Sequence, residues 1–331
     1  MWAHLNLYLD PEDPACSDPL RRVMAHLGDY AAVIVEPLKA RPTDATLVRA
    51  TNQRIEVRLT TATHHLLLVI APEADLAHEV FFLRSLAACD LPAPRLIAYD
   101  LSCANVPFTY AIETYPGSLT LDRINDAALV RIAGRQTGRM LRRVHRIEAP
   151  GYGAPTPTGR WSARTWREAL AGWLEQRSFD DRAEAVLGAD ITSALRAATL
   201  DHPTLACTQP RVLHGAVEPA RIVVTVGESV QLEGLVQPAP PVGGDPLFDL
   251  AYALASRQSA AFRRGVMEGY EMAGTLTAEQ HTRIDRLRLL IDVAQALEEG
   301  DPAVLAGLPA AVMARLEALG EGIVNRATVS Q

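Results

Sequence analysis

The arrangement of hydrophobic residues changes once along this chain, near residues 116–119, and this change does most to constrain the fold. Before it, short runs alternate in polarity or carry β-branched residues, which is typical of strands. These runs cover residues 46–50, 54–59, 66–70, 95–99 and 108–114. A single helix is predicted over residues 75–88, where Val80 and three leucines recur on one stripe. The first part of the chain therefore predicts a small antiparallel sheet with one helix.

Beyond this point the pattern becomes mainly helical. Apolar stripes predict helices over residues 126–145, 163–175, 181–187, 192–200, 277–298 and 303–319. Three short strands interrupt them, at residues 212–213, 221–226 and 231–236. Residues 150–159 are rich in Gly and Pro and are expected to form a loop.

The chain is thus predicted to be α+β in three parts. Residues 1–45 form an N-terminal extension that caps the small lobe, residues 46–116 form this small lobe, and residues 117–331 form a helical lobe. Within the extension, residues 5–9 are expected to be extended and residues 19–26 to be helical.

Composition excludes several classes of protein. Hydrophobic residues make up 48% and charged residues 21%, which is typical of a soluble globular chain. The longest apolar run, residues 66–71, is far shorter than the ~20 residues of a membrane helix, and no secretory signal begins the sequence. A net charge of −7 argues against a nucleic-acid partner. We expect a cytoplasmic protein with neither a membrane nor a nucleic acid among its partners.

Cysteine and lysine usage narrow the chemistry further. The four cysteines are scattered, with no CxxC pair and no histidine at ligand spacing, so neither a disulfide framework nor a metal site is predicted. Lys39 is the only lysine in the chain, and the other basic residues are arginines. Any chemistry that needs an ammonium group therefore has almost no candidate residue.

Four segments resemble the aminoglycoside phosphotransferase/choline kinase-like family. VLHGAVEPARIVV (212–224) resembles its catalytic loop, hydrophobic-x-HGDxxxxN, and GLVQPAPPVGGDPLFDLA (234–251) resembles its metal-binding segment, with IDW followed by GDPxxDLA. HEVFFLRSLAACDLPAPRLIAYD (78–100) and RMLRRVHRIEAPGYG (139–153) resemble the small-lobe glutamate helix and the entry to the large lobe. The resemblance implies a protein-kinase-like two-lobe fold.

The departures from this family fall on the residues that carry its chemistry. Ala216 stands where the resemblance places the catalytic aspartate, and Arg221 where it places the metal-binding asparagine. Gln237 replaces the metal-ligand aspartate, and Val69 replaces the phosphate-binding lysine or arginine of the small lobe. Magnesium prefers carboxylate oxygens as ligands. An arginine that stands in place of a metal ligand is repelled by the cation. The sequence therefore predicts no ATP–Mg phosphotransfer, no metal and no cofactor.

What is retained is interpreted as structural. His214 and Gly215 are expected to shape the loop, and Asp245 and Asp249 to brace it and the following helix. Glu79 would pair with the missing lysine in an active kinase. We expect it to pair instead with an arginine such as Arg58, or to face solvent.

Three functional interpretations remain open. The first is a pseudokinase scaffold that partners an enzyme of natural-product or peptide modification, as some relatives do. A peptide or small molecule would occupy an interlobe cleft lined by Glu79, Glu113, His214, Arg221 and Gln237. Arg221 would either meet an anion or form a salt bridge to Asp245 or Glu218.

The second interpretation is a repurposed enzyme that catalyses a cyclisation or an elimination in the same cleft. Its candidate catalytic residues are His214, Glu218, Arg221 and Asp245. The third interpretation is an active small-molecule kinase that uses other groups.

Overall fold

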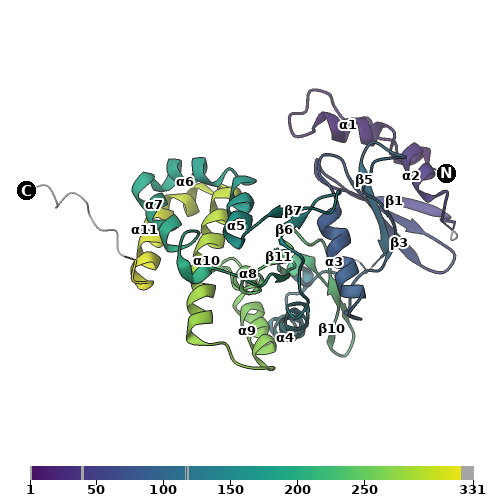
Figure 1. Cartoon of the computed structure of the whole chain (residues 1–331). Coiled ribbons are helices and arrows are strands. Elements are labelled where there is room, and N and C mark those ends of the chain that lie inside the picture. Colours follow the sequence, from purple (N-terminus) through teal and green to yellow (C-terminus); the bar gives the residue numbers. More distant parts are fainter. Residues whose placement is uncertain (1, 39–40, 116, 118, 322–331) are drawn as a thin grey trace, which may run out of the picture. The chain divides into compact units, whose positions relative to one another are not determined.

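The computed structural model describes residues 2–38, 41–115, 117 and 119–321. The chain divides into two compact units (Figure 1). Unit 1 comprises residues 1–118 and 155–160, and unit 2 comprises residues 119–154 and 161–331. Lys39, together with residues 116 and 118 of the predicted junction, lies outside the described residues. The predicted fold class is confirmed, with an antiparallel sheet in the N-terminal part and a mainly helical C-terminal part.

Unit 1 is built on a five-stranded sheet with the order β1-β2-β3-β5-β4. All neighbouring strands are antiparallel. The strands are β1 (Asp44–Ala50), β2 (Ile55–Thr60), β3 (His65–Ala71), β4 (Leu96–Asp100) and β5 (Thr109–Thr114). Helix α3 (Ala77–Ala87) follows β3. The five strands and the helix predicted for this part of the chain are therefore confirmed to within about two residues at most ends.

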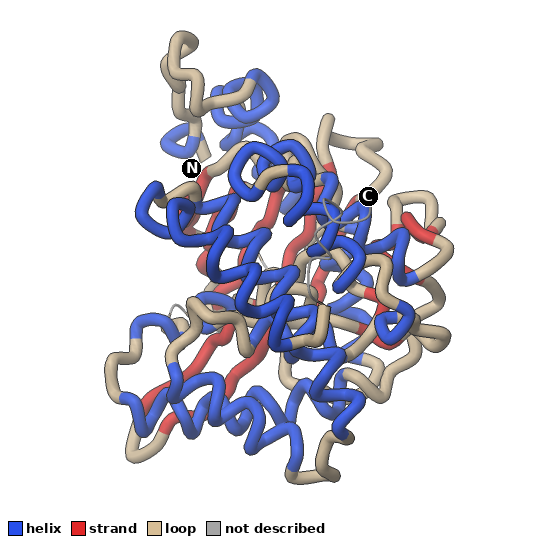
Figure 2. Tube along the Cα trace, turned by 90° about the vertical axis from the view of Figure 1, so that its left-hand side faces the viewer, coloured by secondary structure: helices blue, strands red, loops and turns tan. Residues whose placement is uncertain are grey.

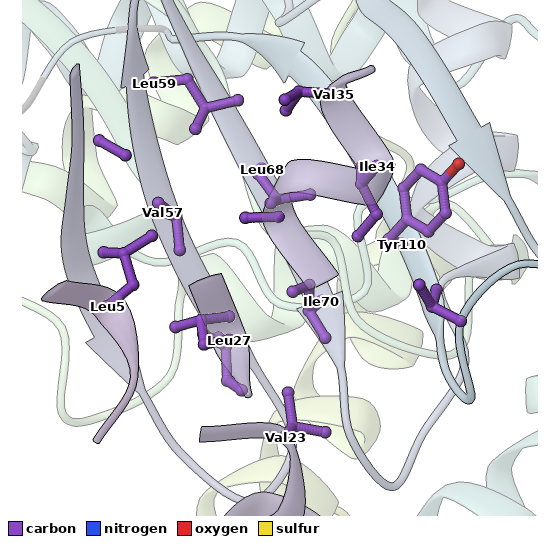
Figure 3. Close-up of a cluster of buried hydrophobic side chains, with 14 of the residues drawn as sticks. Leu5, Val23, Leu27, Ile34, Val35, Val57, Leu59, Leu68, Ile70 and Tyr110 are labelled. Atoms are coloured by element: carbon purple, nitrogen blue, oxygen red, sulfur yellow. The ribbon is translucent and has the colours of Figure 1, made fainter. Parts of the chain in front are cut away.

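One face of this sheet is covered by the N-terminal elements η1 (Ala3–Leu5), α1 (Asp18–Ala25) and α2 (Leu27–Val35). Figure 3 shows Leu5, Leu27 and Ile34 beside strand side chains such as Leu68. The turn between β1 and β2 is also held, because Asn52 accepts a hydrogen bond from the Ser17 amide (2.9 Å) and donates to the Ala15 carbonyl (3.0 Å).

The helix expected over residues 19–26 is confirmed as α1, whereas the sequence pattern did not indicate α2. Residues 3–5 form a short 3₁₀ helix, which includes only Leu5 of the segment 5–9 that was expected to be extended. Helix α2 begins with Leu-Gly and ends in three β-branched residues, which lowers its intrinsic helical propensity. Burial of its apolar side against the sheet supplies the stability that propensity does not.

The other face of the sheet carries a smaller apolar cluster. Leu67, Val69 and Ala71 of β3 pack there with Leu76 and with Val80 of α3. Because side chains alternate along a strand, β3 contributes apolar residues to both faces and is apolar almost throughout. This explains the continuous apolar run in its sequence.

Unit 2 is mostly helical (blue in Figure 2). Its helices are α4 (Ala127–Val144), α5 (Trp166–Glu175), α6 (Phe179–Leu187), α7 (Ala189–Ala198), α8 (Leu247–Ala253), α9 (Ala260–Glu271), α10 (Ala278–Glu299) and α11 (Pro302–Ala318). Helices α4 and α9 approach closely at glycines. A Cβ on Gly138 would lie 2.1 Å from the Val266 carbonyl oxygen, so only glycine permits this separation. No helix among the described residues has both the length and the apolar character to cross a bilayer.

Short strands connect these helices. They are β6 (Tyr152–Pro155), β7 (Trp161–Ala163), β8 (Arg211–Val212) and β11 (Gly243–Gly244) in one sheet, and β9 (Ile222–Val226) and β10 (Val230–Leu235) in a hairpin. Short 3₁₀ turns lie at η2 (Leu121–Arg123), η3 (Pro203–Leu205) and η4 (Pro219–Arg221). The loop expected over residues 150–159 is partly wrong, because β6 pairs there with β11.

Candidate functional site

The loop that carries the His-Gly-Ala sequence follows β8 and has a conformation that requires glycine. Gly215 has φ +78°, in the left-handed region. A Cβ at this position would also lie 1.7 Å from the Ala239 carbonyl oxygen. Ala216 follows and is almost fully buried, so no carboxylate is available where the resemblance places the catalytic aspartate.

Asp249 braces this loop, as predicted. Its Oδ2 accepts a hydrogen bond from the His214 amide (2.8 Å) and its Oδ1 accepts one from the Gly215 amide (2.8 Å). His145 Nε2 donates to the same carboxylate (3.0 Å), and His145 Nδ1 contacts the Tyr270 hydroxyl (3.0 Å). Because Asp249 is 0% exposed, these contacts fully replace its hydration.

His214 is also integrated into the fold, which confirms its structural interpretation. Its side chain is fully buried, and Nε2 donates to the Val236 carbonyl oxygen (3.0 Å). Burial lowers the pKa of His214 to about 4, although nearby Asp249 opposes this shift. The imidazole is therefore neutral at physiological pH.

Asp245 lies at the start of α8 and is held by two contacts. Oδ1 accepts a hydrogen bond from the Leu247 amide (3.0 Å), and Oδ2 forms an ion pair with Arg283 of α10. Burial raises the pKa of Asp245, and Arg283 partly opposes that rise. The predicted bracing role is confirmed, but Arg221 is not the partner of this carboxylate.

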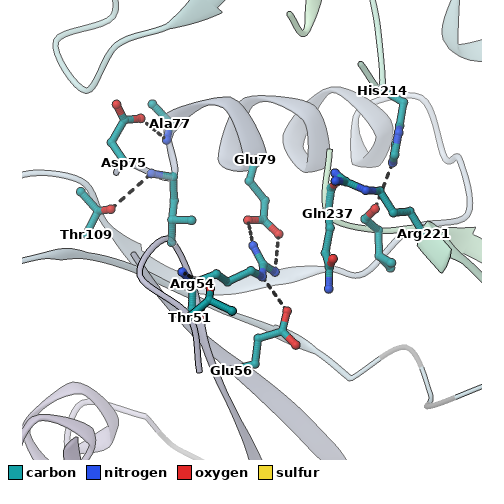
Figure 4. A network of polar contacts seen from close by, with 12 residues as sticks. Thr51, Arg54, Glu56, Asp75, Ala77, Glu79, Thr109, His214, Arg221 and Gln237 are labelled. Atoms are coloured by element: carbon teal, nitrogen blue, oxygen red, sulfur yellow. Dashed lines mark hydrogen bonds and ion pairs between the residues drawn. The ribbon is translucent and has the colours of Figure 1, made fainter. Parts of the chain in front are cut away.

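Arg221 instead joins the positions where the resemblance places two metal ligands. Its Nε donates to Glu218 Oε1 (2.9 Å), so the alternative salt bridge predicted from sequence is confirmed. Its Nη1 donates to the backbone carbonyl oxygen of Gln237 (2.5 Å), as Figure 4 shows. Gln237 has φ +53°, in the left-handed region. The other Glu218 oxygen is engaged by Arg257, so both oxygens contact guanidinium groups.

In unit 1, the position of the family's lysine is apolar and its glutamate has another partner. Val69 is fully buried in the apolar cluster beside α3. Glu79 is 1% exposed and pairs with Arg54, with Nη1–Oε2 and Nη2–Oε1 distances of 2.6 and 3.0 Å (Figure 4). Arg54 Nε also donates to Glu56 (2.5 Å). The arginine pairing expected for Glu79 is confirmed, but its partner is Arg54 rather than Arg58.

A third carboxylate lies on the same face of the sheet. Glu113 of β5 is opposite Leu67 in the strand register and is 3% exposed. Burial and the neighbouring Glu79 raise the pKa of Glu113 well above its ordinary value, and Arg54 opposes this rise. Arg54 itself loses hydration, but Glu79 and Glu56 more than compensate and raise its pKa. Three carboxyl groups therefore surround the Arg54 guanidinium on this face, and Arg58, opposite Leu67 in the strand register, is a second arginine there.

This excess of carboxyl groups leads to a testable expectation for Glu113→Gln. Because the folded state raises the pKa of Glu113, the residue destabilises the fold at any pH above the ordinary value of 4.5, where the unfolded chain ionises. The variant should therefore raise the free energy of unfolding at neutral pH by on the order of 1 kcal/mol. The gain should shrink as pH falls towards 4.5.

Urea unfolding at several pH values measures this difference. Glu12→Gln, at an exposed glutamate of the same unit, is the matched control and should change nothing. A gain for Glu113→Gln that does not depend on pH would contradict the burial of an ionisable carboxyl group as its cause.

Three residues that complete these networks were not predicted from the sequence, namely Arg54, Arg257 and Arg283. Each pairs with a carboxylate on another element, at a sequence separation of 25 to 39 residues. Only Arg54 left a signal, because it lies two residues from Glu56 and alternation places both on one face. Among the described residues, no group of three or more His, Cys, Asp or Glu side chains is arranged to hold a metal ion.

Comparison with known proteins agrees with this architecture. A model of the phosphotransferase enzyme family, APH, matches residues 48–290. A thermostable mutant of aminoglycoside phosphotransferase APH(4)-Ia, in ternary complex with ADP and hygromycin B, has a TM-score of 0.59 and 18% identity over 86% of this chain and 96% of that chain. The APH(2")-IIIa structure with GDP and kanamycin has a TM-score of 0.57 and 12% identity over 88% of this chain and 99% of that one.

Spectinomycin phosphotransferase APH(9)-Ia, in complex with ADP and spectinomycin, has a TM-score of 0.54 and 14% identity over 87% of this chain and 92% of its own. The curated proteins include no significant match. At these identities the structures establish the fold alone, whereas the family model covers well over half of the 331 residues. This chain belongs to the phosphotransferase enzyme family.

Proposed function

We propose that this protein has lost ATP–Mg phosphotransfer and acts as a binding subunit, which holds a peptide or small-molecule ligand for a partner enzyme. The observation that carries the proposal is the 2.5 Å hydrogen bond from Arg221 to the Gln237 carbonyl oxygen. It joins two positions where the family resemblance places metal ligands, and it puts a positive charge between them.

Electrostatics argue against a magnesium ion at these positions. Magnesium needs oxygen ligands in near-octahedral geometry and usually takes one or two carboxylates from the protein. Glu218 is the carboxylate that pairs with Arg221, and both of its oxygens are paired with arginines. Two like unit charges ~4 Å apart repel by about 4 kcal/mol at an effective dielectric of 20. Arg221 would have to leave before a cation could bind.

Contacts within unit 1 also argue against phosphotransfer. Phosphoryl transfer relies on positioning and on cations that neutralise the developing phosphate charge. Val69 offers no charge, and Arg54 is already bonded to Glu79 and Glu56. In the solved relatives named above, the same fold holds ADP or GDP together with an antibiotic. We infer that this chain keeps the fold without that chemistry.

The remaining acid–base candidates are all occupied by contacts within the fold. His214 is fully buried, Asp245 is paired with Arg283, and Glu218 is paired with two arginines. The described residues therefore supply no observation that favours a repurposed enzyme over a binding subunit.

Isothermal titration calorimetry with ATP, with and without magnesium, tests the loss of phosphotransfer. We expect no magnesium-dependent heat at millimolar nucleotide. Micromolar, magnesium-dependent binding followed by ATP turnover would overturn the proposal. The binding role is tested by affinity capture from the source cells and reconstitution. A captured enzyme whose turnover rises when this chain is added supports the role, whereas turnover that this chain leaves unchanged counts against it.

Restoring two family residues should not restore activity. In the double variant Ala216→Asp and Gln237→Asp, Arg221 still places its guanidinium at the former metal site, and the carbonyl that it contacts is unchanged. Val69 also still lacks a charge. We expect no ATP hydrolysis above background in a coupled ADP-release assay.

Adding Arg221→Asn to that double variant is the informative comparison. If magnesium binding returns only in the triple variant, Arg221 is the residue that excludes the cation. ATP turnover by the double variant alone would contradict this role of Arg221.

A further inference from the structure

We propose that a pocket within unit 2 binds a small oxyanion that carries two or more negative charges. The pocket is a cavity of about 390 Å³ that lies apart from the Arg221–Gln237 contact. It is bounded by the C-terminal end of α4, residues 206–211, the start of α8, and helices α9 and α10. This inference does not depend on the proposed loss of phosphotransfer.

Four arginines line the pocket and only one carboxylate does. The arginines are Arg142, Arg146, Arg211 and Arg283, and the carboxylate is Asp245. The Cys207 thiol adds no charge, because burial and nearby Asp245 raise its pKa to about 11. The charged side chains that line the cavity therefore carry a net charge of +3, from four positive charges and one negative charge.

Two of these arginines have no carboxylate partner in the part of the chain that the structure describes. Arg142 lies over the Tyr270 ring, with 4.9 Å from its Cζ to the ring centroid, and Arg146 is exposed. Arg211 contacts Glu148 (3.3 Å), but the Glu148 side chain is 83% exposed, so solvent weakens this pair. Arg211 also donates to the Arg146 carbonyl oxygen (3.2 Å) and to the Gln209 side chain (3.4 Å), which are neutral acceptors and leave its positive charge uncompensated.

Arg283 also lines the pocket and adds a donor. Its Nη2 contacts Asp245 and the Ala206 carbonyl oxygen. Its Nε is buried and has no hydrogen-bond partner among the described residues. An unsatisfied buried donor destabilises the fold, and an oxyanion in the pocket would be a suitable acceptor.

The helix dipole alone does not explain this arrangement. Arginine is favoured near the C-terminal end of a helix, which accounts for Arg142 at the end of α4. Arg211 and Arg283 come from β8 and α10, so they owe nothing to that effect. Bringing like charges from several elements around one cavity costs energy that a bound anion would recover.

The dimensions and walls of the pocket indicate the class of ligand. A volume of about 390 Å³ lies at the lower end of the range for small-molecule sites. The planar guanidinium fork matches both phosphate and carboxylate groups in two-point contacts. Pro246, Leu247 and the Tyr270 ring provide an apolar wall for a short carbon skeleton. A phosphorylated or polycarboxylate metabolite shares this chemistry.

Calorimetric titration of the full chain with pyrophosphate, and separately with citrate, tests the site at fixed ionic strength. We expect saturable one-to-one binding of at least one of these anions. The double variant Arg146→Gln and Arg211→Gln should weaken the binding affinity by about tenfold or more. Each substitution removes a charged donor, and hydrogen bonds to charged groups are stronger than neutral ones. Arg283 is left intact because it holds Asp245.

The matched control is Arg143→Gln with Arg164→Gln, which removes two exposed arginines of the same unit outside the pocket. This control should bind as the unaltered chain does.

Binding of pyrophosphate alone supports a phosphorylated ligand, binding of citrate alone supports a polycarboxylate, and binding of both supports a general oxyanion site. Equal melting temperatures without ligand establish that the variants are folded. If the double variant melts at a lower temperature, the single variant Arg146→Gln, at an exposed residue, replaces it. No saturable binding at millimolar anion, or an equal loss in the control, would overturn the proposal.

Discussion

Replacement of Asp249 by alanine should lower the free energy of unfolding by about 3–5 kcal/mol, because the cost combines several unsatisfied buried donors. The carboxylate is 0% exposed and accepts hydrogen bonds from the His214 amide, the Gly215 amide and His145. Alanine replaces none of these acceptor atoms, and water has no direct access to the site. Urea unfolding followed by circular dichroism measures the loss.

The conservative variant Asp249→Asn separates hydrogen bonding from cavity formation. Its amide oxygen can still accept from the Gly215 amide, but its NH₂ group would face the His214 amide, which is also a donor. We therefore expect an intermediate loss of stability. Hydrogen exchange at the His214 and Gly215 amides should accelerate in both variants. Unchanged protection at these amides would contradict the role of Asp249 in holding the loop.

The bracing role of Asp249 could be predicted because it depends on a local motif. The GDPxxDLA segment places Asp245 and Asp249 at the start of one helix, and α8 does begin in this segment, at Leu247. The Arg221–Glu218 pair could also be predicted, because only three residues separate its members. Interactions set by a short stretch of chain leave a readable signal in the sequence.

The partners of Glu79 and Asp245 could not be chosen from the sequence. Arg54, directly before β2, and Arg58 within it are four residues apart and share a face, since side chains alternate along a strand, and the position of α3 decides which of them reaches Glu79. Arg283 lies 38 residues after Asp245 on a different helix. The sequence patterns identify the faces that are buried, but the pairing of charges across those faces depends on how the elements pack.

Helix α2 shows the same limitation in the fold itself. Its intrinsic propensity is weak, yet Leu27 and Ala31 are completely buried against the sheet. Tertiary packing therefore decides its conformation. By contrast, β3 was predicted readily, because burial on both faces makes it apolar along most of its length.

The second large effect is expected for Arg54→Met, which should lower the free energy of unfolding by about 3–5 kcal/mol at neutral pH, as for other broken buried ion pairs. Methionine keeps much of the side-chain volume but removes the cation that Glu79 and Glu56 contact at 2.6 and 2.5 Å. Glu113, whose pKa burial already raises, also loses the nearby positive charge that opposes this rise. Urea unfolding of both proteins across a pH series measures the difference.

The pH dependence identifies the cause of this loss. Without Arg54, the pKa of Glu113 loses the nearby charge that opposes its rise and lies further above that of the unfolded chain, so the penalty is present at neutral pH and declines as this carboxyl group becomes protonated. The difference between variant and unaltered chain should therefore shrink between pH 7 and about 5.

Combining Arg54→Met with Glu79→Gln should recover part of the stability, because the second change removes one uncompensated charge. Arg54→Lys keeps the charge but cannot contact both carboxylates through a planar fork. Its free energy of unfolding should therefore lie between those of Arg54→Met and the unaltered chain. A constant, pH-independent loss would instead assign the role of Arg54 to packing, and its ion pairs would then contribute nothing to the position of α3.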